Sequence, residues 1–209
     1  MKNNISCILL LIIITFIAVA RLFSATGCDL NDPDRDISRI FPGYTKYKTD
    51  YLSLNKTGGS DILPKIEKAL GDKFSGLYEN IDVPYTLYTV YKDTQQIGYI
   101  HGVNQKGSFG GIQVFLALDN KGIILKFYIQ KLTSKGAKQL RSESFANQFT
   151  GLSLKEFYHY NIPAGKFENM ENPPVINNPA LKAADDYRSI LRAVKKNLVL
   201  MQEFVYKKN

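Results

Sequence analysis

Apolar residues in the first third of the chain recur at helical spacing in two places. Asp32 and Pro33 predict the start of a short helix, with Asp as the N-cap and Pro at the first helical position. Residues 44–54 alternate loosely between apolar and polar and predict a strand. A second helix is expected over residues 61–70, where apolar side chains recur every four residues and Gly71 follows.

The middle of the chain is rich in Tyr, Thr, Val and Ile, which favour strands. It predicts four strands over residues 83–91, 96–103, 111–119 and 123–130. The last two are joined by Asn-Lys-Gly at 120–122, the composition of a tight hairpin turn in which Gly adopts a positive φ. Short connections favour antiparallel neighbours, so these segments predict an antiparallel meander.

The last third is predicted to be helical. Residues 135–149 are expected to contain a helix that buries Leu140, Phe145 and Phe149, and residues 161–178 form a loop rich in Pro and Asn. A long amphipathic helix is expected to start at Asn178-Pro179, and a helix usually packs its one apolar face on the core. Its apolar stripe comprises Tyr187, Ile190, Leu191, Val194, Leu198, Met201 and Phe204. The order of elements predicts an α+β fold, an antiparallel β-sheet meander packed by helices.

A run of sixteen apolar or small residues fills positions 5–20 and ends at Arg21. Three interpretations stay open. In the first, the run is an uncleaved signal anchor, although a full span needs about 20 apolar residues. In the second, it is a signal peptide that is cleaved after an A-x-A site at 18–20. In the third, the protein is a lipoprotein and Cys28 bears the lipid. Each predicts a membrane or signal helix within residues 1–28. Each also places the remainder outside the cytoplasm, most simply at a bacterial cell membrane, facing the periplasm or the cell exterior.

Composition narrows the possible chemistry. The 209 residues carry 27 Lys and Arg against 19 Asp and Glu, a formal net charge of +8, but the basic residues are scattered. Without a basic stripe and interleaved aromatic side chains, nucleic-acid binding is not expected. The two Cys and two His lack the spacing of metal ligands, so no metal site is expected. No pattern of a hydrolase triad is present, and we predict no catalytic residues.

One segment carries candidate binding chemistry. Residues 102–111 join two predicted strands and contain four Gly. Gly lets a backbone approach a ligand closely, and successive free N–H groups bind anions. Lys106 adds positive charge, and Phe109 is able to lie on a planar ring. These residues suit a phosphate-bearing planar ligand, but a wide, bulged hairpin stays open, because Gly clusters mark bulges more often than sites.

The Gly-rich segment is the first part of a longer stretch that resembles a known family. Residues 107–124 read GSFGGIQVFLALDNKGII, and residues 145–151 read FANQFTG. Together they resemble the FMN-binding domain family, which occurs in the G subunit of the Rnf electron-transport complex and the C subunit of sodium-pumping NADH:quinone reductase. The resemblance covers roughly residues 83–200. It implies a domain over 83–209, preceded by a helix/strand extension over 29–82, and one N-terminal membrane helix.

Two departures from the family bear on the cofactor. Covalent members attach FMN through a Thr that opens the last helix, but the matching position lies near Ala184, and no Thr follows Thr150. An Ala methyl cannot form the phosphoester bond, and Asp185 and Asp186 would repel a phosphate. The loop that carries E-T-P-G in the family has Leu132 in place of the acid and no Pro. The resemblance therefore implies noncovalent FMN, if any.

The resemblance implies cofactor-binding residues in the Gly-rich segment and in the loop after the fourth strand of the meander: Lys106, Gly107, Phe109, Gly110, Gly111, Thr133 and Ser134. Lys106 would meet the phosphate. The implied function is electron transfer by a membrane-tethered extracytoplasmic protein, as a subunit of a membrane protein complex rather than a free-standing enzyme. The alternative is a non-redox accessory or scaffold subunit of a membrane transport or respiratory complex. A sensor of a small ligand also stays open.

Overall fold

The computed structural model describes residues 28–208, and the predicted N-terminal membrane or signal helix lies outside this range. Within it, no helix combines the length and the apolar character needed to cross a membrane. The elements, in chain order, are α2 (Pro33–Ile40), β1 (Lys46–Leu52), α3 (Leu54–Thr57), η1 (Gly59–Ile62), α4 (Leu63–Leu70), β2 (Tyr85–Lys92), β3 (Gln95–Gly107), β4 (Gly110–Leu118), β5 (Ile124–Lys131), α5 (Ala137–Leu140), α6 (Glu143–Ala146), η2 (Asn147–Phe149), α7 (Leu154–Phe157), β6 (Tyr160–Asn161), β7 (Lys166–Phe167), η3 (Leu181–Ala183), α8 (Ala184–Phe204) and η4 (Tyr206–Lys208).

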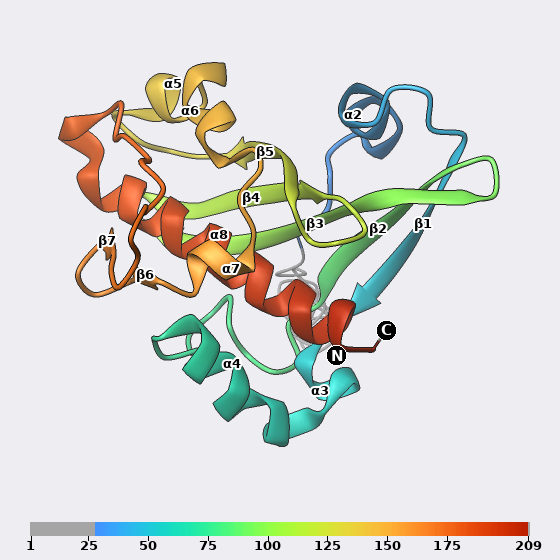
Figure 1. The fold of residues 1–209 in the computed structure, drawn as a ribbon, viewed down its shortest axis with the longest axis horizontal. Coiled ribbons are helices and arrows are strands. Elements are labelled where there is room, and N and C mark those ends of the chain that lie inside the picture. Colours follow the sequence, from blue (N-terminus) through green and yellow to red (C-terminus); the bar gives the residue numbers. More distant parts are fainter. Residues whose placement is uncertain (1–27, 209) are drawn as a thin grey trace, which may run out of the picture.

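Five strands form one antiparallel sheet in the order of the sequence, β1-β2-β3-β4-β5 (Figure 1). The ladder between β3 and β4 places His101 opposite Leu116 and Gly107 opposite Gly110. The predicted α+β fold with an antiparallel meander is confirmed. The strand predicted at 44–54 is β1, which pairs with β2, so residues 29–82 and 83–209 share one sheet.

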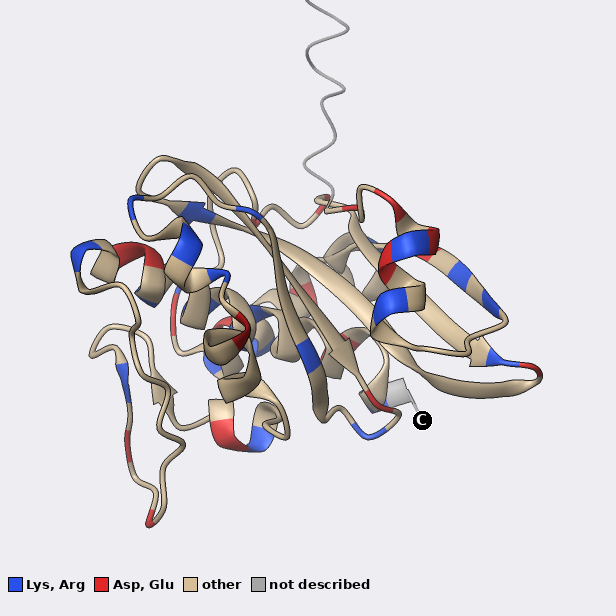
Figure 2. Cartoon of the chain, turned by 90° about the horizontal axis from the view of Figure 1, so that it is seen from above, with Lys and Arg blue, Asp and Glu red and all other residues tan. Residues whose placement is uncertain are grey.

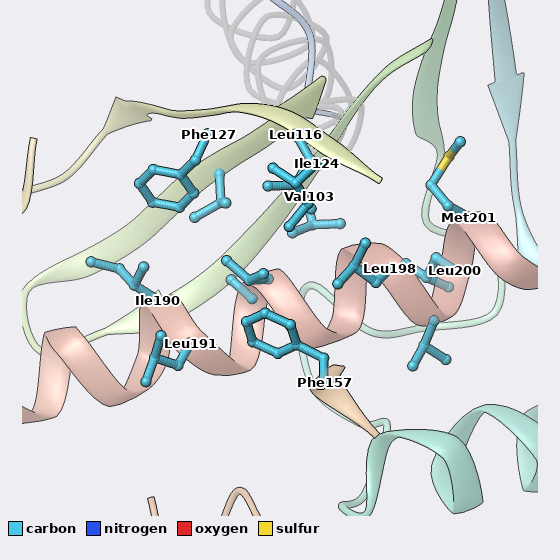
Figure 3. Packing of buried hydrophobic residues seen from close by; sticks show 14 of the residues in the cluster. Val103, Leu116, Ile124, Phe127, Phe157, Ile190, Leu191, Leu198, Leu200 and Met201 are labelled. Carbon is cyan, nitrogen blue, oxygen red and sulfur yellow. The ribbon is translucent and has the colours of Figure 1, made fainter. Parts of the chain in front are cut away.

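The two faces of the sheet are covered differently. On one face α8 lies across β3 and β4 and forms the main core, and Figure 3 shows Ile190 and Leu198 of α8 on the side that faces Val103 and Leu116. On the other face α2 and residues 28–30 cover a smaller apolar cluster. We call these the inner and the outer face.

Local sequence explains why α8 is long. No Gly or Pro interrupts residues 184–204, and Asp185 and Asp186 in its first turn interact favourably with the helix dipole. A 3₁₀ turn at 181–183 precedes it, so the helix begins later than the predicted Asn178-Pro179. The predicted apolar stripe is buried from Ile190 onward.

The Gly-rich segment differs from its prediction. Instead of a wide loop over 102–111, β3 continues to Gly107, and only Ser108 and Phe109 form the turn to β4. Gly102 lies inside the strand, where a Cβ would overlap the Phe115 ring and the Cys28 carbonyl oxygen. This Gly therefore permits close packing of the outer face rather than approach of a ligand.

Residues 135–149 contain helix, but in three short pieces. Gly136 precedes α5, and the Ser142 hydroxyl accepts a hydrogen bond from the Phe145 amide at the start of α6. The chain changes direction at each new helix start. Gly and Ser stand at these starts because they favour helix boundaries over helix interiors. Leu140, Phe145 and Phe149 are nevertheless fully buried, as predicted.

Candidate functional site

The tip of the β3–β4 hairpin separates two cavities, each lined in part by α8. The two-residue turn is closed by Gly110, whose φ of +115° lies in a region that other residues rarely adopt. The Phe109 side chain at the tip is 58% exposed, although large apolar side chains are usually covered. Ser108 lines both cavities, so the tip forms the wall between them.

The larger cavity has a volume of about 610 Å³ and lies between the hairpin and the segment 75–79. Its wall includes the side chain of Tyr78, whose hydroxyl sits close over Gly111. Lys106 lines it and makes no ion pair within the described part of the chain. A cavity of this size, with aromatic, glycine and cationic neighbours, suits a small organic ligand with an anionic group.

Arg192 of α8 closes the floor of this cavity. Its Nε donates to Asp72 Oδ2 at 2.7 Å, and its two terminal nitrogens donate to both oxygens of Glu79, to Gln105 Oε1 and to the Lys73 carbonyl oxygen. These five bonds use all five N–H groups of the guanidinium. Arg192 therefore holds residues 72–79 in place and has no donor left for a ligand.

Lys196, one turn further along α8, is fully buried and completes the network. Its Nζ donates to Glu79 Oε1 at 2.8 Å and to the Asn104 carbonyl oxygen at 2.6 Å. Burial alone raises the pKa of Glu79, but Arg192 and Lys196 outweigh it and hold that pKa below its ordinary value. Burial lowers the pKa of Lys196, although Glu79 opposes the shift. The network is a satisfied ion cluster that shapes the cavity wall.

The smaller cavity, of about 230 Å³, lies on the other side of the hairpin tip at the start of α8. Phe109, Ser134 and the helix start contribute to its lining, together with two lysines and two aspartates: Lys135, Lys182, Asp185 and Asp186. Ala184 is the first residue of α8. Its volume is below the usual range of about 300–1,000 Å³ for ligand pockets.

Asp186 already occupies the anion position of the smaller cavity. The Ser108 amide donates to its Oδ1 at 2.8 Å, and the residue is 2% exposed. Burial raises the pKa of Asp186, but hydrogen bonds from the Ser108 amide and from the Ser134 and Ser108 hydroxyls outweigh it and hold the pKa below its ordinary value. A phosphate at this helix start would compete for the same donors and meet a buried negative charge. The smaller cavity therefore does not fit a phosphate.

The structure brings the predicted site residues to one hairpin but not to one cavity. Lys106, Gly107 and Gly110 line the larger cavity, and Gly111 lies under Tyr78. The other predicted residues are elsewhere: Phe109 and Ser134 line the smaller cavity, and Thr133 is exposed and lines neither.

Sequence reasoning missed the walls of the larger cavity. Segment 75–79 was assigned no role, and Arg192 and Lys196 sit among the apolar positions of the last helix, where a charged residue is a signal of a buried ion pair. His101 is buried, and its Nδ1 lies 2.9 Å from Asn197 Oδ1. Among the described residues no cluster of acids, His and Cys could hold a metal ion.

The fold belongs to the class of α+β domains in which one long helix crosses an antiparallel meander. We found no protein-family model that matches the sequence and no curated protein that is similar to it. Three chains of solved structures are similar in fold. One is the C subunit of the Na⁺-translocating NADH-quinone reductase from Parabacteroides distasonis, with a TM-score of 0.50 and 13% sequence identity over 88% of this chain and 89% of that chain. At this identity the likeness shows a shared fold.

Proposed function

We propose that this chain is a membrane-tethered, extracytoplasmic subunit of an electron-transfer assembly and that it binds FMN noncovalently in the larger cavity. The observation that carries the proposal is that cavity, about 610 Å³ beside Lys106. Its volume lies within the usual range of about 300–1,000 Å³ for ligand pockets. The fold shared with a subunit of an NADH-quinone reductase supports the setting in a membrane complex.

Residues of the hairpin and of segment 75–79 would hold the cofactor. The Lys106 ammonium, which has no ion-pair partner among the described residues, would meet the phosphate. Gly110 leaves room for the ligand at the backbone, whereas the space at Gly107 is filled by Ile112 and Asp186. Tyr78 offers an aromatic ring. Bound FMN would supply one- and two-electron chemistry, while the chain supplies position and polarity. Ser134 is engaged by Asp186, so we assign it no contact with the flavin.

A second candidate is a non-redox accessory subunit that keeps the fold as a scaffold. The start of α8 favours it, because Ala184 cannot form a phosphoester and Asp186 takes the donors that an anion would use. In this interpretation Phe109, 58% exposed, serves contact with a partner protein rather than with a flavin ring.

Flavin titration of the full-length protein in detergent separates the two candidates. Saturable quenching of FMN fluorescence, with weaker binding of riboflavin, would support a pocket that recognises phosphate. No quenching by a protein that circular dichroism shows to be folded would favour the scaffold, and co-purification of a membrane complex would be the next measurement.

Lys106→Ala tests the phosphate contact. We expect FMN affinity to fall about 5-fold, because a partly exposed ion pair contributes up to ~1 kcal/mol, and riboflavin affinity to stay unchanged. Lys121→Ala removes the same charge from the exposed β4–β5 turn and is the matched control. Equal FMN affinity in the Lys106→Ala and Lys121→Ala proteins would refute the assignment of Lys106.

A further inference from the structure

The first described residues are tied across the outer face of the sheet. The Leu30 amide donates to the Tyr88 hydroxyl of β2 at 3.1 Å, and the Thr86 hydroxyl of β2 donates to Asp29 Oδ1 at 2.6 Å. The Gln130 side chain of β5 binds the same segment twice: its Nε2 donates to the Asp29 carbonyl oxygen, and its Oε1 accepts from the Asn31 amide, both at 2.8 Å.

Cys28 lies inside this arrangement rather than on the surface. It is 1% exposed and packs in the outer-face cluster with Tyr88, Ile100 and Phe115. Its carbonyl oxygen approaches the backbone of Gly102 so closely that a Cβ there would be 2.8 Å away. Burial raises the pKa of the Cys28 thiol, and the neighbouring Asp29 raises it further, so little reactive thiolate is present.

We propose that residues 28–31 are an internal clamp across β2, β3 and β5, that Cys28 carries no lipid, and that the chain is held at the membrane by the apolar segment at 5–20. A lipid on the Cys28 sulfur would have to leave the interior of the outer-face cluster. That exit would expose Leu30 and break the bonds to Tyr88 and Gln130. The membrane tether in this proposal rests on the proposed function, whereas the clamp does not.

The clamp also sets the orientation of the domain. Residues 21–27 are the only residues between the apolar run and Cys28, and seven residues span at most ~25 Å when fully extended. Cys28 therefore lies within ~25 Å of the end of the apolar run, and the outer face, which the clamp crosses, is the face nearer the bilayer. Arg192 and Asp186 of α8, which covers the opposite, inner face, line parts of the two cavities. Figure 2 shows acidic and basic residues side by side on α2, the helix of the outer face, where Arg35 and Arg39 pair with Asp36.

Lipid attachment is measured first, in full-length Cys7→Ala protein expressed in a bacterium, so that Cys28 is the single thiol. We expect no incorporation of an alkyne-labelled fatty acid, and retention in the membrane after alkaline carbonate washing, both unchanged in Cys28→Ala. Labelling that disappears in Cys28→Ala would overturn the proposal, whether or not that variant stays in the membrane. Unlabelled protein in the soluble fraction would overturn the membrane tether but leave the clamp and the flavin site standing.

Thiol reactivity tests the clamp without a lipid assay. In the folded Cys7→Ala protein, Cys28 should react with a maleimide at least ~100-fold more slowly than in urea, because reaction requires local opening. Gln130→Ala removes two bonds of the clamp and should raise the folded rate at least ~10-fold. Gln139→Ala, an exposed Gln on α5, is the matched control and should leave the rate unchanged. If Cys28 in the folded Cys7→Ala protein reacts as fast as it does in urea, no clamp exists.

Orientation is tested with two matched Ser→Cys substitutions in a protein that lacks Cys7 and Cys28. Ser38→Cys places a fluorophore on α2, and Ser75→Cys places one at the rim of the larger cavity. In vesicles that contain a headgroup-attached quencher, the probe at position 38 should be quenched at least ~2-fold more strongly. Equal quenching, or stronger quenching at position 75, would overturn the orientation.

Discussion

The start and the middle of α8 both bury charged side chains against the sheet, but they stabilise them differently. At the start, Asp186 accepts hydrogen bonds from the neutral groups of Ser108 and Ser134, and no cation in the described part of the chain forms a salt bridge with it. In the middle, Arg192 and Lys196 form salt bridges with the carboxylate of Glu79, at 2.5 and 2.8 Å.

This difference separates an adaptable region from a structural one. Neutral donors around Asp186 remain satisfied if another anion or a polar oxygen replaces the carboxylate. Removing one member of the ion cluster instead leaves a buried opposite charge that has lost part of its pairing. The middle of α8 therefore fixes the wall of the larger cavity, while the start of α8 is where a change of sequence would change ligand preference.

Arg192→Met should produce the largest loss of stability. Glu79 would lose its bidentate partner, and Asp72 and Gln105 would each lose a bond. Breaking a buried ion pair from one side costs about 3–5 kcal/mol. Urea denaturation should show a free energy of unfolding lower by about that amount, and amide exchange should show faster opening of residues 72–79.

Arg188→Met is the matched control, since Arg188 is an exposed arginine one turn earlier on the same helix. We expect its free energy of unfolding to stay within about 0.5 kcal/mol of the wild type. Equal losses in the two variants would mean that the buried cluster contributes nothing beyond an ordinary surface arginine.

His101 of β3 contacts Asn197 in the middle of α8 and makes the stability of the protein sensitive to acid. The residue is fully buried, and its Nδ1 lies 2.9 Å from Asn197 Oδ1. Burial lowers the pKa of His101 from 6.5 to about 4, against the effect of the Asn197 hydrogen bond. Between these values the unfolded chain binds a proton that the folded chain does not. The free energy of unfolding should therefore fall by about 3 kcal/mol as pH decreases from 6.5 to 4.

Urea denaturation at several pH values isolates this contribution. His101→Gln removes the titrating group and keeps polar atoms that can hydrogen-bond Asn197, so its stability should depend less on pH over that window. His159→Gln removes the exposed histidine and should keep the wild-type dependence. Parallel curves for His101→Gln and wild type would assign the acid sensitivity to other groups.

The helices and strands could be predicted from the sequence better than the contacts between them. Periodicity located α4, the five strands of the main sheet and the apolar stripe of α8, but not the short β6–β7 hairpin, which extends into the predicted loop at 161–178. Asp32 does cap α2, where its carboxylate accepts from the Arg35 amide. These features depend on residues close in sequence, or on one repeating pattern. The tight turn at 120–122 follows the same rule, because Asp119 accepts from the Lys121 and Ile123 amides.

The walls of the larger cavity depend on contacts between distant residues. Arg192 meets Glu79 across 113 positions, and nothing local in either segment specifies the other. The role of Gly102 in the Gly-rich segment could not be predicted for a related reason. Gly102 is required by Phe115 and by Cys28, which reach it from another strand and from the N-terminal segment, so its role is not visible in its own neighbourhood.

Asp186→Ala should have the smallest effect on stability and the most specific effect on binding. Loss of the bond from the Ser108 amide and of the favourable helix-dipole interaction should lower the free energy of unfolding by about 1 kcal/mol. The freed donors would then bind an external anion. Phosphate should therefore raise the melting temperature of Asp186→Ala by stabilising the folded state, and leave the wild type unchanged.

Asp185→Ala is the matched control, because Asp185 carries the same charge at the same helix start but is exposed. If phosphate stabilises Asp185→Ala as much as Asp186→Ala, the effect is one of net charge, and the buried carboxylate does not block an anion site. If phosphate stabilises Asp186→Ala alone, Asp186 itself is what keeps an anion from the start of α8. Any flavin phosphate then has to bind at the Lys106 side of the hairpin.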